Sequence, residues 1–450
     1  RHFKQEGRSS YDAALAGMHK ASGVIASSAA TTFFGFLSLC AMAFLIGADM
    51  GVVLAKGIVF SFLSVLFLLP VMVLLSEKLL QRTAHRKFLP SFDKFAKWCM
   101  RLSIPFTLIA ALIVVPAFLG SRNTEYVYGA SGFVEPGSQL YEDTELIEET
   151  FNASGQCAVL VPEGQWGKEK ELVAALDTLP HVSSITSYVT TVSERIPTDM
   201  VPPASLESLI SGGYSRIIIA TDLRGESPEA FELVQRIRDL CQLYYPDEAK
   251  LIGSTVTSYD MSLIVNDDSA RVLFASIIAI GLVLLLMFRS LSIPLILLLT
   301  IESSIWINLA IPYFAGETIQ YIGYLIISAI MLGATVDYTI ILTRSYLDKR
   351  RVQPKRQAIT EAISRSAITI LTSATILTLC GAFIGLISSN GVIASLGTLI
   401  GRGAFIAALN TFLLLPMLFM IFDRVIEKTT LGTHFYKQPY KQPLEEKAGR

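Results

Sequence analysis

Long apolar stretches recur along the chain, and they constrain its fold more than any other feature. Eight of them are long enough to cross the roughly 30 Å hydrocarbon core of a bilayer as helices. They cover residues 21–46, 50–75, 102–119, 272–288, 291–314, 320–343, 367–388 and 392–421. Only 17% of the residues are charged, against about 25% in soluble domains. The sequence therefore predicts an α-helical polytopic membrane bundle with about eight transmembrane helices.

Basic residues gather on one side of this bundle. The short loops near Asp49, Glu317 and Asn390 hold no Lys or Arg. Because cytoplasmic loops carry an excess of Lys and Arg, we expect a multi-pass protein of the cytoplasmic membrane with both chain ends inside and residues 121–270 outside. The basic residues are Arg1, Lys4, Arg8 and Lys20, then Lys78, Arg82, Arg86, Lys87, Lys94, Lys97 and Arg101, then Arg344, Lys349, Arg350, Arg351, Lys355, Arg356 and Arg365.

The segment at residues 121–270 differs sharply in composition, since Gly, Pro, Ser, Glu and Asp replace the aliphatic residues. We expect strands at 156–162, 182–189, 216–221 and 250–254, and helices at 168–179 and 228–244. Two successive βαβ units are typical of an inserted α/β domain with a ferredoxin-like βαββαβ fold. Residues 200–213 are expected to form a long loop with a short helix, because prolines and glycines interrupt them.

These features predict five parts along the chain. They are a cytoplasmic loop with two helices and a basic linker (1–101), one helix (102–120), an extracytoplasmic porter-like domain (121–270), five helices (271–422) and a cytoplasmic tail (423–450).

An acid and a tyrosine interrupt the apolar run at residues 321–342. A charge at the centre of a membrane helix costs roughly 2.5–3.5 kcal/mol on insertion scales, and such residues usually mark a proton or ion path. Asp337 is our candidate proton carrier, and the hydroxyl of Tyr338 could donate or accept a hydrogen bond as the acid changes state. The alternative is a permanently neutral Asp337 that only stabilises the bundle.

Small and hydroxyl-bearing residues accompany this pair. Gly333, one turn earlier, would let a neighbouring helix approach closely. A stripe of hydroxyls on the next span would face the acid, or would merely bond to backbone carbonyls of its own helix. The stripe contains Thr369, Thr372, Ser373 and Thr375, and an earlier helix repeats part of it with Ser28 and Thr31.

An internal repeat links the two ends of the chain. Residues 11–42 resemble residues 355–386 at a constant offset of 344, which pairs Ser28 with Thr372, and the match resumes around Lys56 and Arg402 after a shift of two residues. Duplicated halves are typical of secondary transporters. Extended upstream, the repeat places a partner for Asp337 before Arg1, so we expect the chain to be the back part of a protein with about twelve spans.

The run GATVDYTIILTRSY at residues 333–346, the basic loop after it and the two-half layout resemble the MMPL branch of the resistance-nodulation-division (RND) exporters. The resemblance extends over nearly the whole chain and implies spans five to twelve of such a protein. It also implies a proton relay, formed by Asp-Tyr pairs on spans four and ten, that drives export of lipids or other hydrophobic compounds. In this chain only Asp337 and Tyr338 match that motif. The implied partners are a hydrophobic or lipid substrate, protons, the bilayer and the N-terminal half of the same protein; an oligomer is compatible with the sequence.

Three further polar residues lie in apolar spans. Glu302, near the centre of residues 291–314, is a second buried acid that could extend the relay, form an ion pair or face a water-filled path. Lys56 and Arg402 are expected near the outer ends of their spans, where anchoring at the interface is favoured over chemistry.

Other kinds of site find no support. The five histidines have no metal-ligand spacing, no Gly-x-x-x-x-Gly-Lys phosphate loop occurs, and nothing indicates an enzyme, a cofactor or a nucleic-acid partner. Cys157 and Cys241 either form a disulfide or remain two buried thiols. The leading hypothesis is a proton-driven lipid exporter. The alternatives are a lipid- or sterol-sensing-like receptor and an accessory secretion subunit without turnover.

Overall fold

The computed structural model describes residues 10–82, 92–124, 126–129, 155–193, 200–223, 226–432 and 435–436, with single positions at 139, 142, 143, 146, 147, 150, 195 and 196. Among the basic residues named above, Arg1, Lys4, Arg8, Arg86 and Lys87 lie outside the described residues, as does the tail beyond residue 436. The chain divides into two compact units: residues 1–125, 268–387 and 393–450 form one, and residues 126–267 with 388–392 form the other.

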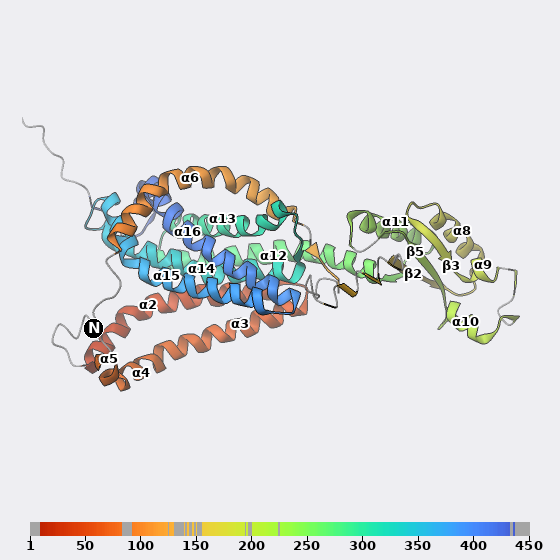
Figure 1. The fold of residues 1–450 in the computed structure, drawn as a ribbon, viewed down its shortest axis with the longest axis horizontal. Helices are drawn as coiled ribbons and strands as arrows, with labels where there is room; N and C mark the ends of the chain where they lie inside the picture. Colours follow the sequence, from red (N-terminus) through yellow and green to blue (C-terminus); the bar gives the residue numbers. More distant parts are fainter. Residues whose placement is uncertain are drawn as a thin grey trace, which may run out of the picture. The chain divides into compact units, whose positions relative to one another are not determined.

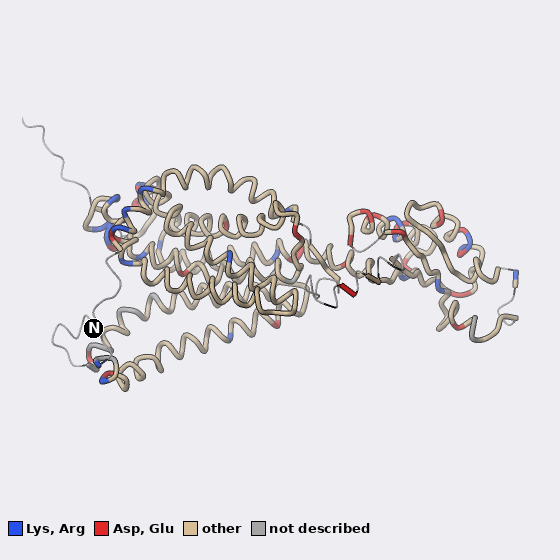
Figure 2. Tube along the Cα trace, viewed as in Figure 1, with Lys and Arg blue, Asp and Glu red and all other residues tan. Residues whose placement is uncertain are grey.

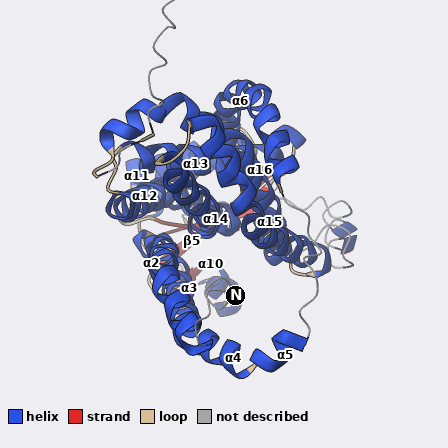
Figure 3. Ribbon diagram, turned by 90° about the vertical axis from the view of Figure 1, so that its left-hand side faces the viewer, coloured by secondary structure: helices blue, strands red, loops and turns tan. Residues whose placement is uncertain are grey.

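The first unit is a bundle of helices that lie side by side (Figures 1 and 3). Its helices are α2 (Ser10–Leu37), α3 (Leu45–Leu63), α4 (Leu69–Leu75), α5 (Glu77–Arg82), α6 (Asp93–Arg122), α12 (Ser254–Phe288, which begins in the second unit), α13 (Ser292–Ala315), α14 (Tyr321–Arg350), α15 (Lys355–Ile387) and α16 (Gly391–Thr429). Charged residues are sparse along the middle of the bundle and gather at its ends (Figure 2).

Seven helical segments in the described part of the chain are long and apolar enough to cross a membrane. They are Leu45–Leu75, Asp93–Arg122, Ser254–Phe288, Ser292–Ala315, Ile326–Arg350, Lys355–Ile387 and Gly391–Thr429. The first predicted span corresponds to a shorter apolar helix, Ile25–Ala41. The chain is therefore a multi-pass, mostly helical membrane protein with a small sheet region.

The predicted end of the first span, residue 46, is wrong. Helix α2 ends at Leu37, a 3₁₀ turn covers Ser38–Ala41, and α3 already begins at Leu45, so that Asp49 lies in a helix and not in a loop. The fully buried Asp268 of α12 explains the early break. Its carboxylate accepts hydrogen bonds from the backbone amides of Ala43 (2.8 and 3.0 Å) and Phe44 (3.4 Å), which then cannot join a helix.

A proline reshapes the second span. The helix widens to a π-helical turn at Ser64–Leu68, which ends two residues before Pro70. Proline has no N–H to donate to the carbonyl four residues earlier, and such a gap in the helical bonding is commonly absorbed by a local change in helix type. The span continues through this turn, so Leu45–Leu75 still forms one membrane-crossing segment.

Helices α15 and α16 approach each other through glycines. A Cβ built on Gly381 would lie 2.5 Å from the backbone nitrogen of Gly401, and one on Gly397 would lie 2.8 Å from the nitrogen of Gly385. In each helix the two glycines are four residues apart, the spacing that lets membrane helices pack backbone against backbone. This close contact fixes the position of α15.

The second unit contains β1 (Tyr126–Val127) and a sheet with covering helices. In chain order these are β2 (Gly155–Pro162), α8 (Trp166–Asp177), β3 (Val182–Thr186), α9 (Tyr188–Thr191), α10 (Pro203–Leu209), β4 (Ile210–Ser211), β5 (Tyr214–Thr221), α11 (Pro228–Tyr244) and β6 (Lys250–Gly253); the short β7 (Ile319–Gln320) belongs to the first unit. The strand order is β3-β5-β2-β6, with β4 beside β5, and neighbouring strands run antiparallel.

Alternation along the central strands builds the core of this unit. Val159 and Val161 of β2 and Ile217 and Ile219 of β5 are fully buried, and they pack against α8 and α11. The strand predicted at 182–189 ends early, at Thr186, because Ser187 caps the short helix α9. The predicted domain end at residue 270 falls inside α12, which runs without a break from Ser254 to Phe288.

The two cysteines of this unit are free and buried in its core. Burial raises the pKa of the Cys157 thiol to about 11 and that of Cys241 to about 12. This confirms the reading of two buried thiols, which at these pKa values are unreactive at neutral pH.

Candidate functional site

Helix α14, which carries Asp337 and Tyr338, packs against both α2 and α15. The view along the bundle shows α14 between them (Figure 3). Helices α2 and α15 are the two helices that the internal repeat pairs in sequence. The repeat therefore places two equivalent helices on either side of the acid-bearing helix.

Small residues bring α2 close to α14. A Cβ built on Gly35 would lie 3.2 Å from the Cα of Gly333, and the hydroxyl of Thr32 donates a hydrogen bond to the Gly333 carbonyl (2.9 Å). Gly333 thus lies at a helix crossing. Since Asp337 is one turn further along α14, this crossing sets the distance between the acid and α2.

Asp337 has its carboxyl group inside the bundle. Its Oδ1 atom is buried and has no hydrogen-bond partner within the described part of the chain. The side chain of Ser28 on α2 lies within hydrogen-bonding reach of the carboxyl group. A buried polar oxygen without a hydrogen-bond partner costs free energy, so this position is unfavourable for a carboxyl group unless a further partner is supplied.

Tyr338 is also buried, with 1% of its surface exposed. Its hydroxyl finds no hydrogen-bond partner among the residues that the structure describes, although the side chain of Ser373 on α15 lies near it. Two adjacent residues of α14 therefore face hydroxyls from two different helices, Ser28 for the acid and Ser373 for the phenol.

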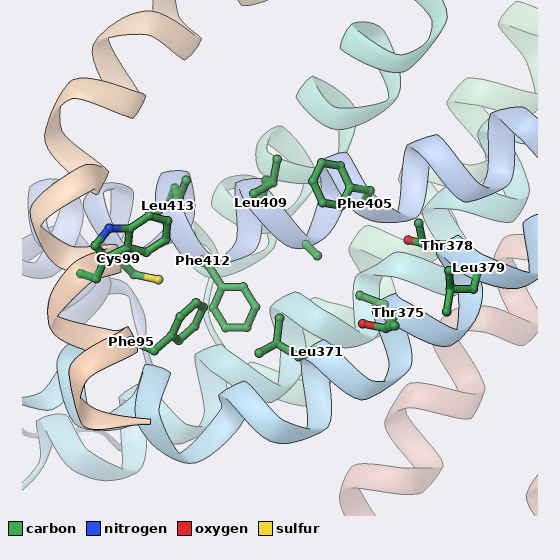
Figure 4. A pocket seen from close by; sticks show the side chains of 13 residues that line it. Phe95, Cys99, Leu371, Thr375, Thr378, Leu379, Phe405, Leu409, Phe412 and Leu413 are labelled. Carbon is green, nitrogen blue, oxygen red and sulfur yellow. The ribbon is translucent and has the colours of Figure 1, made fainter. Parts of the chain in front are cut away.

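The remaining hydroxyls of the predicted stripe do not converge on the pair. Thr31 donates to the backbone carbonyls of Ser27 (3.2 Å) and Ser28 (2.8 Å), which is a packing role. Thr369, Thr372 and Thr375 are exposed on α15, and Thr375 lines a separate apolar cavity (Figure 4). Thr32, which links α2 to α14, was not among the predicted site residues. A hydroxyl-bearing residue within an apolar stretch was the signal that could have identified it.

Glu302 on α13 is a second buried acid, 4% exposed. Both of its carboxylate oxygens lack a hydrogen-bond partner in the described ranges. The neighbouring Ser303 and Ser304 accept hydrogen bonds from the side-chain amide of Asn410 on α16 (3.2 and 2.8 Å). Asn410 lies in an apolar stretch, where an amide could have been noticed from the sequence.

Arg402, which was expected to anchor at the interface, bonds to a neighbouring helix. Its guanidinium donates to the side-chain oxygen of Asn308 on α13 (2.8 Å) and to the Asn308 carbonyl (3.0 Å). Asn308 in turn donates to the carbonyl of Leu399 (2.9 Å). Arg402 therefore links two helices through hydrogen bonds, because a guanidinium inside a bundle needs acceptors. Lys56, its counterpart in the repeat, is exposed.

The groups around Asp337 are chemically able to exchange protons. Asp337, Tyr338 and the two flanking serines offer groups that can donate or accept a proton; Tyr338 is buried, Ser28 is half-buried and Ser373 is exposed. The part of the chain that the structure describes contains no cluster of three His, Cys, Asp or Glu residues able to hold a metal ion.

The sequence pattern of the MMPL family matches residues 1–102 and 133–437. The chain belongs to the MMPL family. Its MMPL relatives include the probable transport protein MmpL8 of Mycobacterium bovis, 27% identical over 267 residues, and the sulfolipid-1 exporter MmpL8 of Mycobacterium tuberculosis, 26% identical over 267 residues. Each alignment covers 57% of this MMPL chain and 23% of the relative.

A similar fold occurs in a solved structure. SecDF of Thermus thermophilus, a translocon-associated membrane protein, superposes with a TM-score of 0.56 at 13% identity. The match covers 93% of this MMPL chain and 51% of that protein. At this identity the likeness shows the fold alone.

Proposed function

We propose that this MMPL chain is part of a secondary active transporter that exports lipids or other hydrophobic compounds and is driven by the proton gradient. Asp337 is the proton carrier and Tyr338 assists it. The observation that carries the proposal is the buried pair itself: the Asp337 Oδ1 and the Tyr338 hydroxyl have no hydrogen-bond partner within the described residues, although both lie in the interior.

The physical basis is the cost of an unpaired buried charge. When Asp337 loses its proton, the carboxylate must be stabilised by additional partners, and the hydroxyl of Ser28 already lies within its reach. A rearrangement of α14 against α2 and α15 follows each change of protonation. Rocking of two repeats around a central site is the general mechanism of such transporters. Glu302 supplies a second protonatable group on α13.

The two units have separate roles in this proposal. The helical unit couples proton movement to a conformational change, and the end of the bundle that carries the basic residues faces the cytoplasm. The second unit is an extracytoplasmic porter-like domain that receives the substrate. Its strand order and antiparallel pairing support a ferredoxin-like βαββαβ fold.

The lipid substrate rests on the relatives. The M. tuberculosis relative is named a sulfolipid-1 exporter, and this chain aligns with about a quarter of its length.

The test uses the native protein that contains this chain, reconstituted into vesicles with an imposed pH gradient. We expect a fluorescent or radiolabelled lipid to accumulate on one side only with the gradient, and Asp337→Asn to lower the rate at least 100-fold, since a neutral amide cannot cycle a proton. Asp348→Asn, an exposed acid on the same helix, is the matched control and keeps the wild-type rate. Transport by Asp337→Asn at the wild-type rate would refute the proton assignment. Lipid binding with no gradient-driven movement would indicate a receptor or an accessory subunit.

A further inference from the structure

An apolar cavity of about 330 Å³ lies between α6, α15 and α16, apart from the Asp337 site. This volume falls at the lower end of the roughly 300–1,000 Å³ that is usual for small-molecule pockets. The walls are almost entirely hydrocarbon and aromatic, with the hydroxyls of Thr375 and Thr378 on the α15 side (Figure 4).

Small buried residues form the floor of the cavity, and exposed aromatic residues form its rim. Ala374 of α15 and Ala408 of α16 are buried and leave the space between these helices open, because neither side chain is large enough to fill it. Trp98 of α6 and Phe405 of α16 also line the cavity but are 57% and 54% exposed. In this structure the cavity therefore opens at the surface of the helical unit.

Three cations lie beside this opening. Lys94, Lys97 and Arg101 are exposed on α6, and Lys94 and Arg101 lie one turn before and one turn after Trp98 on the same helix face. Within the described residues none of the three has an acidic partner. The nearest acid in sequence, Asp93, accepts a hydrogen bond from the hydroxyl of Ser364 on α15 (2.8 Å).

An apolar cavity beside unpaired cations fits one class of molecule. An anionic phospholipid of the bilayer has an acyl chain for the cavity and a phosphate for the cations. Basic pockets between membrane helices are known to recognise such headgroups, at about 1 kcal/mol for each Lys or Arg near the surface. A neutral lipid would fill the cavity without using the charges.

We propose that the cavity between α6, α15 and α16 binds one acyl chain of an anionic phospholipid, whose headgroup is held by Lys94, Lys97 and Arg101. The site is distinct from the proton site, and its test does not depend on the proposed transport. The bound lipid would brace α6 against α15 and α16.

Trp98 gives a direct measurement, because the chain has only three tryptophans. In the native protein, with Trp166 and Trp306 and any tryptophan outside this chain replaced by Phe, the protein is reconstituted in phosphatidylcholine. Phosphatidylglycerol with brominated acyl chains is then titrated in, since bromine quenches a tryptophan that it contacts. We expect saturable quenching at a low fraction of the anionic lipid, and much weaker quenching by brominated phosphatidylcholine at the same fraction.

Two kinds of variant separate the cavity from the charges. Each of Lys94→Gln, Lys97→Gln and Arg101→Gln should weaken the apparent affinity for the anionic lipid about fivefold. The matched control, Lys56→Gln, removes an exposed cation from another span and should change nothing. Ala408→Phe should abolish saturable quenching by filling the cavity, and Ala374→Leu does so from the opposite wall if the first variant misfolds.

Three results would overturn the proposal. They are equal quenching by both brominated lipids, unchanged affinity after removal of all three cations, and unchanged saturable quenching in both filled-cavity variants. Preferential quenching by a brominated free fatty acid over the phospholipid would also contradict it, since the headgroup contact would then be unnecessary.

Discussion

Two buried acids lie along α14, and they differ in how completely their carboxyl groups are hydrogen-bonded. At the end of the helix, Tyr346 and Arg350 surround Asp423 of α16: the phenol donates to the carboxylate at 2.5 Å, and the guanidinium donates to both oxygens at 3.0 Å. Three turns earlier, Asp337 has one oxygen with no partner among the described residues. One acid is fully satisfied and the other is not.

The cluster of Tyr346, Arg350 and Asp423, called the brace below, connects several parts of the helical unit. Arg350 also donates to the carbonyl of Tyr436 (2.8 Å) and lies over the ring of Phe435 (4.8 Å), while Tyr346 stacks on Phe419 (4.9 Å). These contacts tie α14, α16 and the following segment together, and every charge has a partner.

The difference in hydrogen bonding predicts different roles for the two acids. A buried charge with complete partners costs stability when one partner is removed, whereas a buried polar group without partners already costs stability and persists only if it serves another purpose. Asp423 should therefore matter for folding and Asp337 for transport.

The largest expected effect is on the brace. Asp423→Leu leaves Arg350 and the Tyr346 hydroxyl unpaired, and should lower the free energy of unfolding by about 3–5 kcal/mol. Unfolding of the reconstituted protein by heat or denaturant measures this loss. Glu427→Leu, on the same helix, should cost much less. If Asp423→Leu were as stable as the wild type, the claim that Asp423 stabilises the fold through its partners would be contradicted.

Asp337→Leu should change the free energy of unfolding in the opposite direction. Replacing an incompletely bonded buried acid by an apolar side chain of similar size should raise the free energy of unfolding, by about 1–3 kcal/mol, while transport is lost. The same unfolding assay measures it alongside Asp423→Leu. Strong destabilisation by Asp337→Leu would show that the acid has partners essential for folding, and would assign it the structural role.

Tyr338→Phe tests the second member of the pair. Loss of the hydroxyl removes one group that can stabilise the ionised acid, so we expect transport to fall about tenfold, or about 1.4 kcal/mol, with a shifted dependence on pH. Tyr324→Phe on the same helix serves as the control. A tenfold loss with an unaltered pH profile would remove Tyr338 from the proton path.

The smallest effect concerns a buried acid outside the membrane. Burial raises the pKa of Glu169, which is 1% exposed and accepts a hydrogen bond from the Val189 amide (3.5 Å). Because the folded state favours the protonated acid, its contribution to stability is present at low pH and is lost as the pH rises through the raised pKa.

Glu169→Gln should therefore gain stability relative to wild type as the pH is raised from about 4 to neutral, a range that begins near the ordinary glutamate pKa of about 4.3. The melting of the second unit, followed between these two pH values, measures the difference. Glu171→Gln, exposed on the same helix, should show no such trend. A constant difference between Glu169→Gln and wild type at every pH would indicate that burial of Glu169 does not alter its titration.

Much of the fold and part of the site could be predicted from the sequence. The apolar stretches located the helices because a membrane-spanning backbone must satisfy its own hydrogen bonds within the segment, which makes helix formation a local property. The Asp-Tyr pair was visible because an acid in an apolar run is rare. Helix α11, Pro228–Tyr244, was predicted with its observed bounds, since Ser227 and Pro228 mark a helix start and a strong apolar periodicity follows.

The sequence by itself determined which segments are helices and which of them carries an acid. Only the tertiary structure decided what each polar group meets: Asp268 ends α2 from 225 residues away, Asn308 holds Arg402 from 94 residues away, and Ser28 reaches Asp337 from the far end of the chain. The physical reason is that helical hydrogen bonds join residues four apart, whereas side-chain partners depend on how distant helices pack.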